Sequence, residues 1–543
     1  MAFRDGDPPA TRFLSSSEDL AHAKPQVTQA RLIDMSQRIR PLENITAVAL
    51  DDLTEDVDEL YQLATSALHR LRCARAEVER ARHSYARRTL TTELAQLRSA
   101  EEVFSSYACD IRDCLHEARR HRLSVDRLRQ VKSEFADLLR LQQGVAAGLT
   151  VGSDWQSPLF AHSGHPTAGR HSGSVTEHFD DYKRDRHPQA RAFEESYLRE
   201  YVDVPSGLAV RALMTSCGMS AFTTILHFLS VTLDQRSPIV AARGMYHECR
   251  GLLADGALGS RVCWVDETDT IEMLEACRRL QPGALFLDSM CNSKGLPVPD
   301  TQALMLELAT IAKRDVFVVI DNTCASLFCQ PLRLAALNPN VRPVLFESLT
   351  KYAQFGLDRV AAGMIVAPQE EAASLDGVRE HLGTNIADVC AAIVPVPNRS
   401  LLIRRLRRIE RNAHALAQHL SRRGEGTTPV TGTTYPGLES HGGHSAARRL
   451  GFFGGFFAME FRGECDCIAA HGRLVSRLIY EARRRRVNLG AGAGFGFNVT
   501  RVYRTATETG VGPFVRVAAG TEDMIEVERL KEVFASAIGA SAR

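Results

Sequence analysis

The sequence predicts an α/β protein in which a large domain built on a mostly parallel sheet and a smaller C-terminal α+β domain follow an all-helical N-terminal extension. Three observations predict this fold class. Glycine and proline are absent from a long N-terminal stretch, short apolar runs alternate with amphipathic helices from about residue 208, and an arginine-rich helix follows residue 395. The expected domain boundaries are residues 1–150, 151–207 (a connecting arm), 208–390 and 391–543.

The helical extension is predicted from what the sequence lacks. Neither glycine nor proline occurs between Glu43 and Gln143, although the chain contains 38 Gly and 21 Pro. Both residues are costly inside helices, and leucine and alanine recur here at helical intervals, so we expect a helical hairpin or small bundle. Ser124 is the expected N-cap of its last helix. An oligomer contact with a solvated outer face is the favoured role, ahead of a contact with nucleic acid.

The connector between Gly144 and Gly173 is rich in glycine, histidine and serine. Its histidines, His162, His165 and His171, have no cysteine or paired carboxylate beside them to complete a metal site. We therefore expect loop histidines and no bound metal.

The large domain is predicted from continuous apolar runs, which are typical of parallel strands covered on both faces. The clearest runs are Ala284–Leu287, Val316–Ile320 and Val344–Phe346. In the smaller domain, a long helix is expected from Leu401 to Leu420.

Composition excludes several classes of function. Lys+Arg of 66 against Asp+Glu of 65 leaves a net charge of +1, which is not the charge of a polybasic nucleic-acid binder. The 13 cysteines include no CxxC pair, as expected for reduced thiols, and no apolar run approaches the length of a membrane span. We expect a cytoplasmic protein that binds neither nucleic acid nor membrane.

Lysine is scarce, with seven residues among the 66 basic ones. Because arginine stays charged, chemistry that needs a deprotonatable amine has only these seven candidates. Lys351 follows a buried strand and has hydroxyls close by, on Ser348 and Thr350. Such hydroxyls can hold a phosphate and leave the amine free for Schiff-base chemistry.

Two further segments place polar groups at strand ends, where doubly wound sheets bind ligands. Asp321 ends the buried strand VFVVID, where a helix N-cap is the structural alternative to a functional carboxylate. Gly218 opens an apolar helix, and free N–H groups at such a start favour an anion.

Taken together and in this order, the motifs resemble the Cys/Met-metabolism family of pyridoxal-phosphate (PLP) enzymes, which have fold type I. That family includes cystathionine γ-synthases, cystathionine γ- and β-lyases and methionine γ-lyase. The resemblance covers roughly residues 160–543 and leaves the helical extension unaccounted for. It rests on the segments YKRDRHPQARAFEE, TSCGMSA, DSMCNS, DNTCASLFCQPL, SLTKY, YPGLESHGGHSAARR and VRVAAGTED. It makes His441 and His444 framework residues rather than metal ligands.

The resemblance implies PLP as the cofactor and a role for each matching residue. Lys351 would bind the cofactor covalently, Asp321 would pair with its ring nitrogen, and Tyr246 would stack on its ring. The residues implied to hold the phosphate are Gly218, Met219, Ser348 and Thr350, joined by Tyr182 and Arg184 from a neighbouring subunit. Arg516 would bind the carboxylate of an amino-acid substrate, with Asn292 and Asn488 as further substrate contacts. A homodimer or homotetramer with active sites at the subunit interface is implied.

The departures from the family motifs cluster on the substrate side. His247, Glu248 and Cys249 follow Tyr246 where the family has Gly-Gly-Thr, and Phe355-Gly356 replaces Gly-His. Ala493 and Gly494 occupy positions that are acidic or serine in the family. The cofactor contacts are thus retained while the substrate contacts differ, which favours an unusual substrate over an ordinary γ-lyase that has diverged.

The leading expectation is α,γ-elimination on a γ-substituted L-amino acid, for example a halogenated or unsaturated one, as in propargylglycine-forming relatives. The alternative is γ-replacement by a thiol or another nucleophile. A third possibility is a helical scaffold that carries an inactive enzyme domain, and the retention of Lys351, Asp321, Arg184 and Arg516 argues against it.

Overall fold

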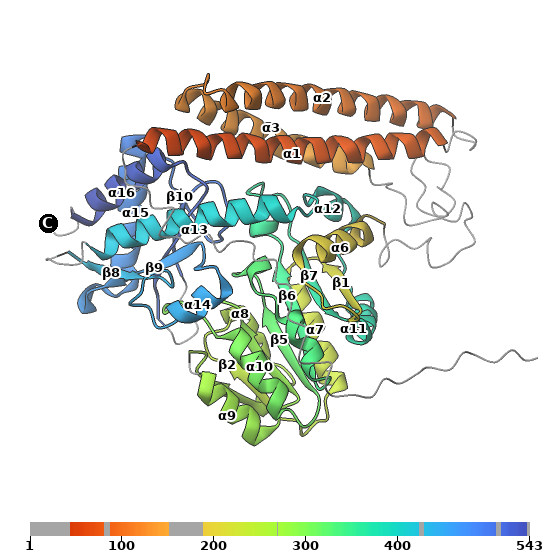
Figure 1. Cartoon of the computed structure of the whole chain (residues 1–543), viewed down its shortest axis with the longest axis vertical. Helices are drawn as coiled ribbons and strands as arrows, with labels where there is room; N and C mark the ends of the chain where they lie inside the picture. Colours follow the sequence, from red (N-terminus) through yellow and green to blue (C-terminus); the bar gives the residue numbers. More distant parts are fainter. Residues whose placement is uncertain are drawn as a thin grey trace, which may run out of the picture. The chain divides into compact units, whose positions relative to one another are not determined.

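A seven-stranded sheet, here called the large sheet, carries the strand ends at which the candidate site lies (Figure 1). The computed structural model of the chain describes residues 44–80, 87–150, 188–268, 270–422, 428–505 and 512–539. In spatial order the strands are β1 (Val210–Thr215), β7 (Gly363–Pro368), β6 (Val341–Ser348), β5 (Val316–Asp321), β4 (Ala284–Asp288), β2 (Ile239–Ala242) and β3 (Val262–Val265). The three predicted apolar runs lie within β4, β5 and β6, and the mostly parallel sheet is confirmed.

Strand direction brings the functional residues to one edge of the large sheet. Only β7 runs against its neighbours, so β1 and β6 on either side of it point the same way. Gly363 at the start of β7 lies opposite both Thr215 and Ser348, the last residues of β1 and β6. Asp288 and Asp321 are also register partners, at the ends of β4 and β5. The segments that follow these strands therefore emerge together.

Helices cover both faces of the large sheet, as the continuous apolar strands require. On one face, Phe222 and Ile225 of α7 (Gly218–Thr232) pack with Phe286 of β4. On the other, Leu304 of α10 (Thr301–Ile311) belongs to the same core as Leu285. The remaining helices of this region are α6 (Pro188–Tyr201), α8 (His247–Asp255), α9 (Thr270–Leu280), α11 (Gln369–Leu382) and α12 (Asp388–Ile393).

A second, five-stranded sheet forms the centre of the C-terminal region. Its order is β10 (Gly490–Ala491), β11 (Arg501–Arg504), β12 (Val515–Ala518), β9 (Phe456–Phe461) and β8 (Val430–Thr434). Its pairs are antiparallel except β10 with β11. The helices here are α13 (Arg399–Ser421), α14 (His444–Leu450), α15 (Ile468–Arg485) and α16 (Met524–Gly539). The predicted arginine-rich helix is α13, which extends one or two residues beyond the predicted range at each end.

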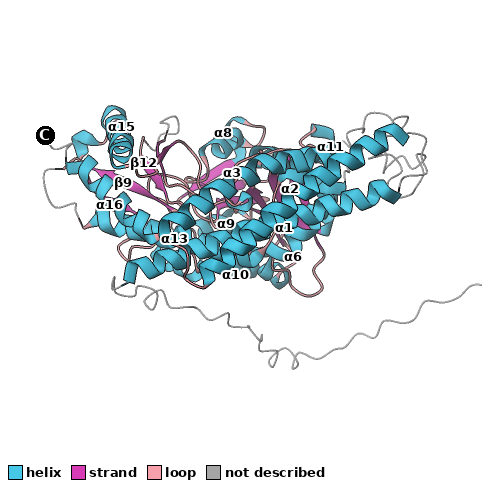
Figure 2. Cartoon of the chain, turned by 90° about the horizontal axis from the view of Figure 1, so that it is seen from above, coloured by secondary structure: helices cyan, strands magenta, loops and turns pink. Residues whose placement is uncertain are grey.

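Three long helices form the extension: α1 (Ile45–Arg80), α2 (Arg87–Arg119) and α3 (Val125–Thr150). Their buried residues, among them Leu53, Leu97, Phe104 and Val131, belong to the same continuous core as those of the two sheets. The Ser124 hydroxyl accepts a hydrogen bond from the Arg127 N–H at 3.3 Å, which confirms the predicted N-cap. The predicted helical region is confirmed, and Figures 1 and 2 show α1 running beside α13.

Two further findings concern the cysteines and the length of the helices. All thirteen cysteines are free thiols. Within the described ranges, no helix combines the length and the apolar character that crossing a membrane would require.

Candidate active site

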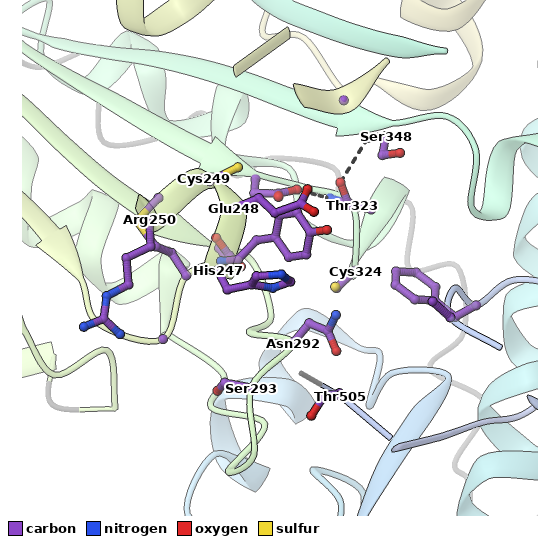
Figure 3. A pocket seen from close by; sticks show the side chains of 18 of the residues that line it. His247, Glu248, Cys249, Arg250, Asn292, Ser293, Thr323, Cys324, Ser348 and Thr505 are labelled. Carbon is purple, nitrogen blue, oxygen red and sulfur yellow. Dashed lines mark hydrogen bonds between the residues drawn. The ribbon is translucent and has the colours of Figure 1, made fainter. Parts of the chain in front are cut away.

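A cavity of about 390 Å³ opens at the edge where β1, β4, β5 and β6 end. Residues that follow those strands line one side, and residues of the five-stranded sheet and its loops line the other (Figure 3). The sequence-predicted residues that line it are Lys351, Asp321, Tyr246, Gly218, Met219, Ser348, Asn292 and Arg516. The fold thus brings together groups that lie up to 298 residues apart in the chain, from Gly218 to Arg516.

Gly218 begins α7 at the floor of the cavity. A Cβ atom at this position would lie 2.8 Å from the Ser348 Cβ, so a side chain has no room there. The helix start is therefore close to the Ser348 hydroxyl, which shares a 2.8 Å hydrogen bond with the Thr350 hydroxyl. Thr350 supports Ser348 but does not itself line the cavity. Free N–H groups at a helix start, next to hydroxyls, fit a phosphate group.

Asp321, the last residue of β5, is 9% exposed. One of its oxygens accepts a hydrogen bond from the Thr323 N–H at 2.9 Å, so it does cap the following turn. Burial raises the pKa of Asp321 to about 6, against the opposing effects of the Thr323 hydrogen bonds and of Lys351. A buried carboxylate beside the cavity has the chemistry to pair with a protonated ring nitrogen.

Two supporting residues were missed by the sequence-based reasoning. Asp288, which ends β4, accepts a hydrogen bond from the Tyr246 N–H at 2.9 Å, and burial together with Asp321 raises its pKa well above the usual range. The other Asp288 carboxylate oxygen, Oδ1, is buried without a partner among the described residues. The Thr323 hydroxyl accepts from the Ser348 N–H at 3.0 Å. A detectable signal existed for Asp288, because it ends an apolar strand just as Asp321 does.

The Lys351 amine is partly withdrawn from solvent. Burial and, after it, the Arg516 charge lower the pKa of Lys351. Its Nζ lies 5.7 Å from the centre of the Phe495 ring. Of the lysines that the structure describes, Lys132, Lys294 and Lys531 form ion pairs with carboxylates, whereas Lys313 and Lys351 have none within the described ranges. A neutral amine is therefore more accessible at Lys351 than at an ordinary surface lysine.

Arg516 of β12 is 4% exposed and lies beside Asn292 at the cavity. It donates to the Asn292 side-chain oxygen at 2.7 Å and to the Gly494 carbonyl at 3.3 Å. Its Nε is buried without a partner among the described residues. A buried guanidinium with an unused donor fits a ligand carboxylate.

Most of the residues that depart from the family motifs line the cavity. His247, Glu248 and Cys249 lie beside Tyr246, and Ala493 and Gly494 belong to the C-terminal region, whereas Phe355 and Gly356 do not line it. The Tyr246 and His247 rings have centroids 4.7 Å apart. Burial and the neighbouring Glu248 raise the pKa of the Tyr246 phenol, which keeps it a hydrogen-bond donor. Figure 3 shows the His247 ring turned toward Asn292 and Cys324, whereas Arg250 points away from them. The family's small residues are thus replaced by ionisable side chains at the cavity surface.

Two of the predicted site residues that the structure describes, Thr350 and Asn488, do not line this cavity. Asn488 is exposed between α15 and β10 and does not line it. Tyr182 and Arg184 lie outside the described residues, as do His162, His165 and His171. His441 and His444 make hydrogen bonds of 2.9 Å with the Gly295 and Pro436 carbonyls, as framework residues would. Among the described residues, no group of three or more histidine, cysteine or carboxylate side chains could hold a metal ion.

Comparisons with known proteins agree with this geometry. A family model described as Cys/Met metabolism PLP-dependent enzyme matches residues 153–479. The bifunctional enzyme flvA of Aspergillus flavus is 27% identical over 365 residues, which are 64% of this chain and 42% of that protein. The L-methionine gamma-lyase of Fusobacterium nucleatum subsp. polymorphum is 26% identical over 263 residues, 46% of this chain and 60% of that protein. The matched region thus spans about half the length of these two relatives.

Solved structures share the fold. A cystathionine gamma synthase from Xanthomonas oryzae pv. oryzae, in complex with cystathionine, aligns with a TM-score of 0.54 and 21% identity over 66% of this chain and 88% of that one. An apo methionine gamma lyase from Micromonospora echinospora aligns with a TM-score of 0.52 and 22% identity, with the same two coverages. About a third of the chain lies outside each alignment.

Proposed function

The chain belongs to the Cys/Met metabolism family of PLP-dependent enzymes, and on that premise we propose that it catalyses α,γ-elimination on a γ-substituted L-amino acid. The proposed substrate is non-standard, for example halogenated or unsaturated. γ-Replacement by a thiol or another nucleophile is the second candidate, because the similar proteins named above include both lyases and a synthase.

The residues of the cavity fit the cofactor of the family. Gly218 and Ser348 would hold the phosphate, Asp321 would pair with the ring nitrogen, and Lys351 would provide the covalent attachment. When bound, PLP supplies an electron sink for negative charge that develops at the substrate Cα.

Lys351 is the group that moves protons in the proposed reaction. Its lowered pKa favours the neutral amine, which can take a proton from the substrate Cα. Lys351 would pass this proton on to the cofactor carbon C4′ and, neutral again, could take a second proton from Cβ. The bond between Cγ and the leaving group then breaks, and the electron pair departs with that group. Arginine could not replace Lys351, since a guanidinium stays protonated.

Arg516 and Asn292 orient the substrate. The observation that carries this assignment is the buried Arg516 Nε, which has no partner among the described residues although its Nη atoms are hydrogen-bonded. A substrate carboxylate would satisfy it and fix the Cα near Lys351. His247 and Glu248 on the opposite wall support a substrate whose distal group differs from the usual thioether.

A substrate screen tests the proposal. The holoenzyme is supplied with L-amino acids that carry different γ-substituents, with and without an added thiol, and products are identified by mass. Elimination releases the leaving group without a thiol. If products form only when the thiol is present, γ-replacement is the activity. In Lys351→Ala the cofactor absorbance band should be lost; an unchanged spectrum would overturn the assignment of Lys351.

A further inference from the structure

A buried arginine of α13 connects the helical extension to the segment beside Lys351. The Arg405 side chain is 1% exposed. Its Nη1 pairs with the Glu59 carboxylate of α1 at 2.8 Å. Its Nη2 donates to the Gly496 carbonyl at 3.0 Å and to the Asn498 side-chain oxygen at 2.6 Å. One guanidinium therefore contacts both the extension and the glycine-rich loop.

The loop held by Arg405, here called the Gly494–Asn498 segment, lies directly against Lys351. A Cβ atom at Gly496 would be 2.9 Å from the Lys351 carbonyl, and one at Gly494 would be 4.0 Å from its Nζ. Phe495 places its ring beside the same amine. The position of this segment thus determines how far the Lys351 amine is shielded from water.

Because Gly356 has no side chain, there is room beside it for the hydrogen bond between Arg405 and Asn498. The φ of Gly356 is +76°, and a Cβ there would lie 2.4 Å from the Asn498 side-chain oxygen and 2.6 Å from the Arg405 Nη2. A larger residue would displace both side chains. Gly356 is part of a departure from the family motif, so the departure and the helical extension meet at Arg405.

Glu59 is the counter-charge of Arg405. Within the described ranges it is the one carboxylate that forms an ion pair with Arg405. Burial raises the pKa of Glu59, and the Arg405 charge opposes that effect. Removing Glu59 would leave a buried guanidinium held by neutral acceptors alone, which is a costly arrangement that favours repacking.

Neighbouring ion pairs join the same two helices without reaching the Gly494–Asn498 segment. Asp58 pairs with Arg404 at 2.6 Å, one residue away from Glu59 on α1 and from Arg405 on α13. This pair provides a matched control, because it holds the extension in place in a similar way.

We propose that Glu59 and Arg405 are positioning residues for Lys351, so that the helical extension supports the active site of its own chain. Glu59 fixes Arg405, Arg405 fixes the Gly494–Asn498 segment, and that segment shields the amine. The inference rests on the proposed role of Lys351, but it does not depend on which reaction the enzyme catalyses.

The test compares Glu59→Gln with Asp58→Asn in the full chain freed of cofactor. An amine-reactive reagent is applied over a range of pH, and the labelling of Lys351 is followed by peptide mass spectrometry. The charged or titratable groups that face the amine are Arg516, Cys324, Asp358 and Asp321. In Glu59→Gln, water should reach Lys351, and the midpoint of its labelling profile should rise by about half a pH unit or more. Asp58→Asn should keep the wild-type midpoint.

Cofactor binding gives a second readout. The dissociation constant of PLP, measured by absorbance, should rise in Glu59→Gln and stay unchanged in Asp58→Asn, and Glu59→Asp should recover part of the loss. The inference is overturned if Glu59→Gln keeps both wild-type values, or if Asp58→Asn changes them equally. Should Glu59→Gln fail to fold, Asn498→Ala removes the acceptor at the other end of the contact. It should raise the midpoint in the same direction, and an unchanged midpoint would overturn the inference.

Discussion

Burial moves the pKa values of Lys351 and Asp321 in opposite directions, because in each case it disfavours the charged form. The lysine becomes easier to deprotonate and the aspartate harder to ionise. Burial at the edge of the large sheet thus shifts the pKa values of both groups before any ligand binds. The cofactor's ring nitrogen would restore the charge of the aspartate, and the substrate would use the free amine.

Lys351→Arg should abolish turnover rather than slow it modestly. The side chain keeps its charge but can neither attach the cofactor nor take up a proton near neutral pH, which costs at least about 100-fold from proton transfer alone. Steady-state kinetics on the substrate found by the screen measure the loss. Lys531→Arg, at a lysine that pairs with Glu528 on α16, should retain activity. Comparable losses in both variants would contradict the prediction.

Asp321→Asn should stabilise the cofactor-free protein at neutral pH. The folded pKa of about 6 lies above the ordinary value of 3.8, so the folded state binds this proton more tightly than the unfolded state does. The penalty for the charged form is thus absent below pH 4, develops as pH rises from 4 to 6, and amounts to about 3 kcal/mol above that. Denaturant unfolding at pH 4 and pH 7 measures it. A variant that is equally destabilised at both pH values would contradict the prediction.

The individual residues were largely predictable from the sequence where a motif follows a buried strand. Lys351, Asp321 and Arg516 all line the cavity. Asn488 does not line it, because the chain turns away after α15 and leaves its side chain exposed. Asp288 and Thr323 were missed, since they act through backbone N–H groups of Tyr246 and Ser348, and those partners are defined only once the strands are in register.

Among the helices and strands, the start of α7 packs closely against the end of β6. Gly218→Ala should weaken PLP binding by about tenfold or more, because the new Cβ would have to displace Ser348 at the phosphate site. Absorbance titration measures the affinity. Gly377→Ala, on α11 with open space around it, is the control and should bind normally. Equal affinity in Gly218→Ala and the wild type would show that the helix start does not hold the phosphate.

The helices α1 and α13 form a second close contact between elements. Asp52 is buried, receives two hydrogen bonds of 2.8 Å from Arg411 and accepts from the Met524 N–H at 3.1 Å. Asp52→Asn should therefore lower the free energy of unfolding by about 3 kcal/mol, measured by urea denaturation. Asp113→Asn removes an exposed ion pair on α2 and should leave the free energy of unfolding nearly unchanged. The reverse order would contradict the docking of the two helices.

The helices themselves were predictable from the missing glycines and prolines, but their packing partner was not. Helix propensity and periodicity are local, whereas Asp52 meets Arg411 across 359 positions of the chain. In the sequence, the acidic residues of α1 and the arginines of α13 are both typical of helix faces that are exposed to solvent. Only the fold places them opposite one another.

For the whole molecule, the resemblance implies an assembly in which Tyr182 and Arg184 act in the site of a neighbouring subunit. We propose a homodimer or homotetramer on this basis. Lys351→Ala and Arg184→Ala should each be inactive alone, whereas co-expression should restore part of the activity, because one mixed site retains both residues. Native mass and activity of the co-purified pair provide the measurement. No recovery in a mixed oligomer would place Arg184 in the site of its own chain.

The charged contact between α1 and α13 also has a consequence for synthesis on the ribosome. Residues 52–59 emerge more than 300 positions before their partners at 404–411. The α1 carboxylates therefore remain without these partners until α13 has been synthesised. The buried apolar residues of α1–α3 belong to one continuous core with residues that are made later, so these helices complete their packing only when the rest of the chain is present. A docking face of carboxylates stays hydrated during that interval, whereas an apolar face would invite aggregation. The salt bridges at this interface thus suit an element that is synthesised long before the helix with which it pairs.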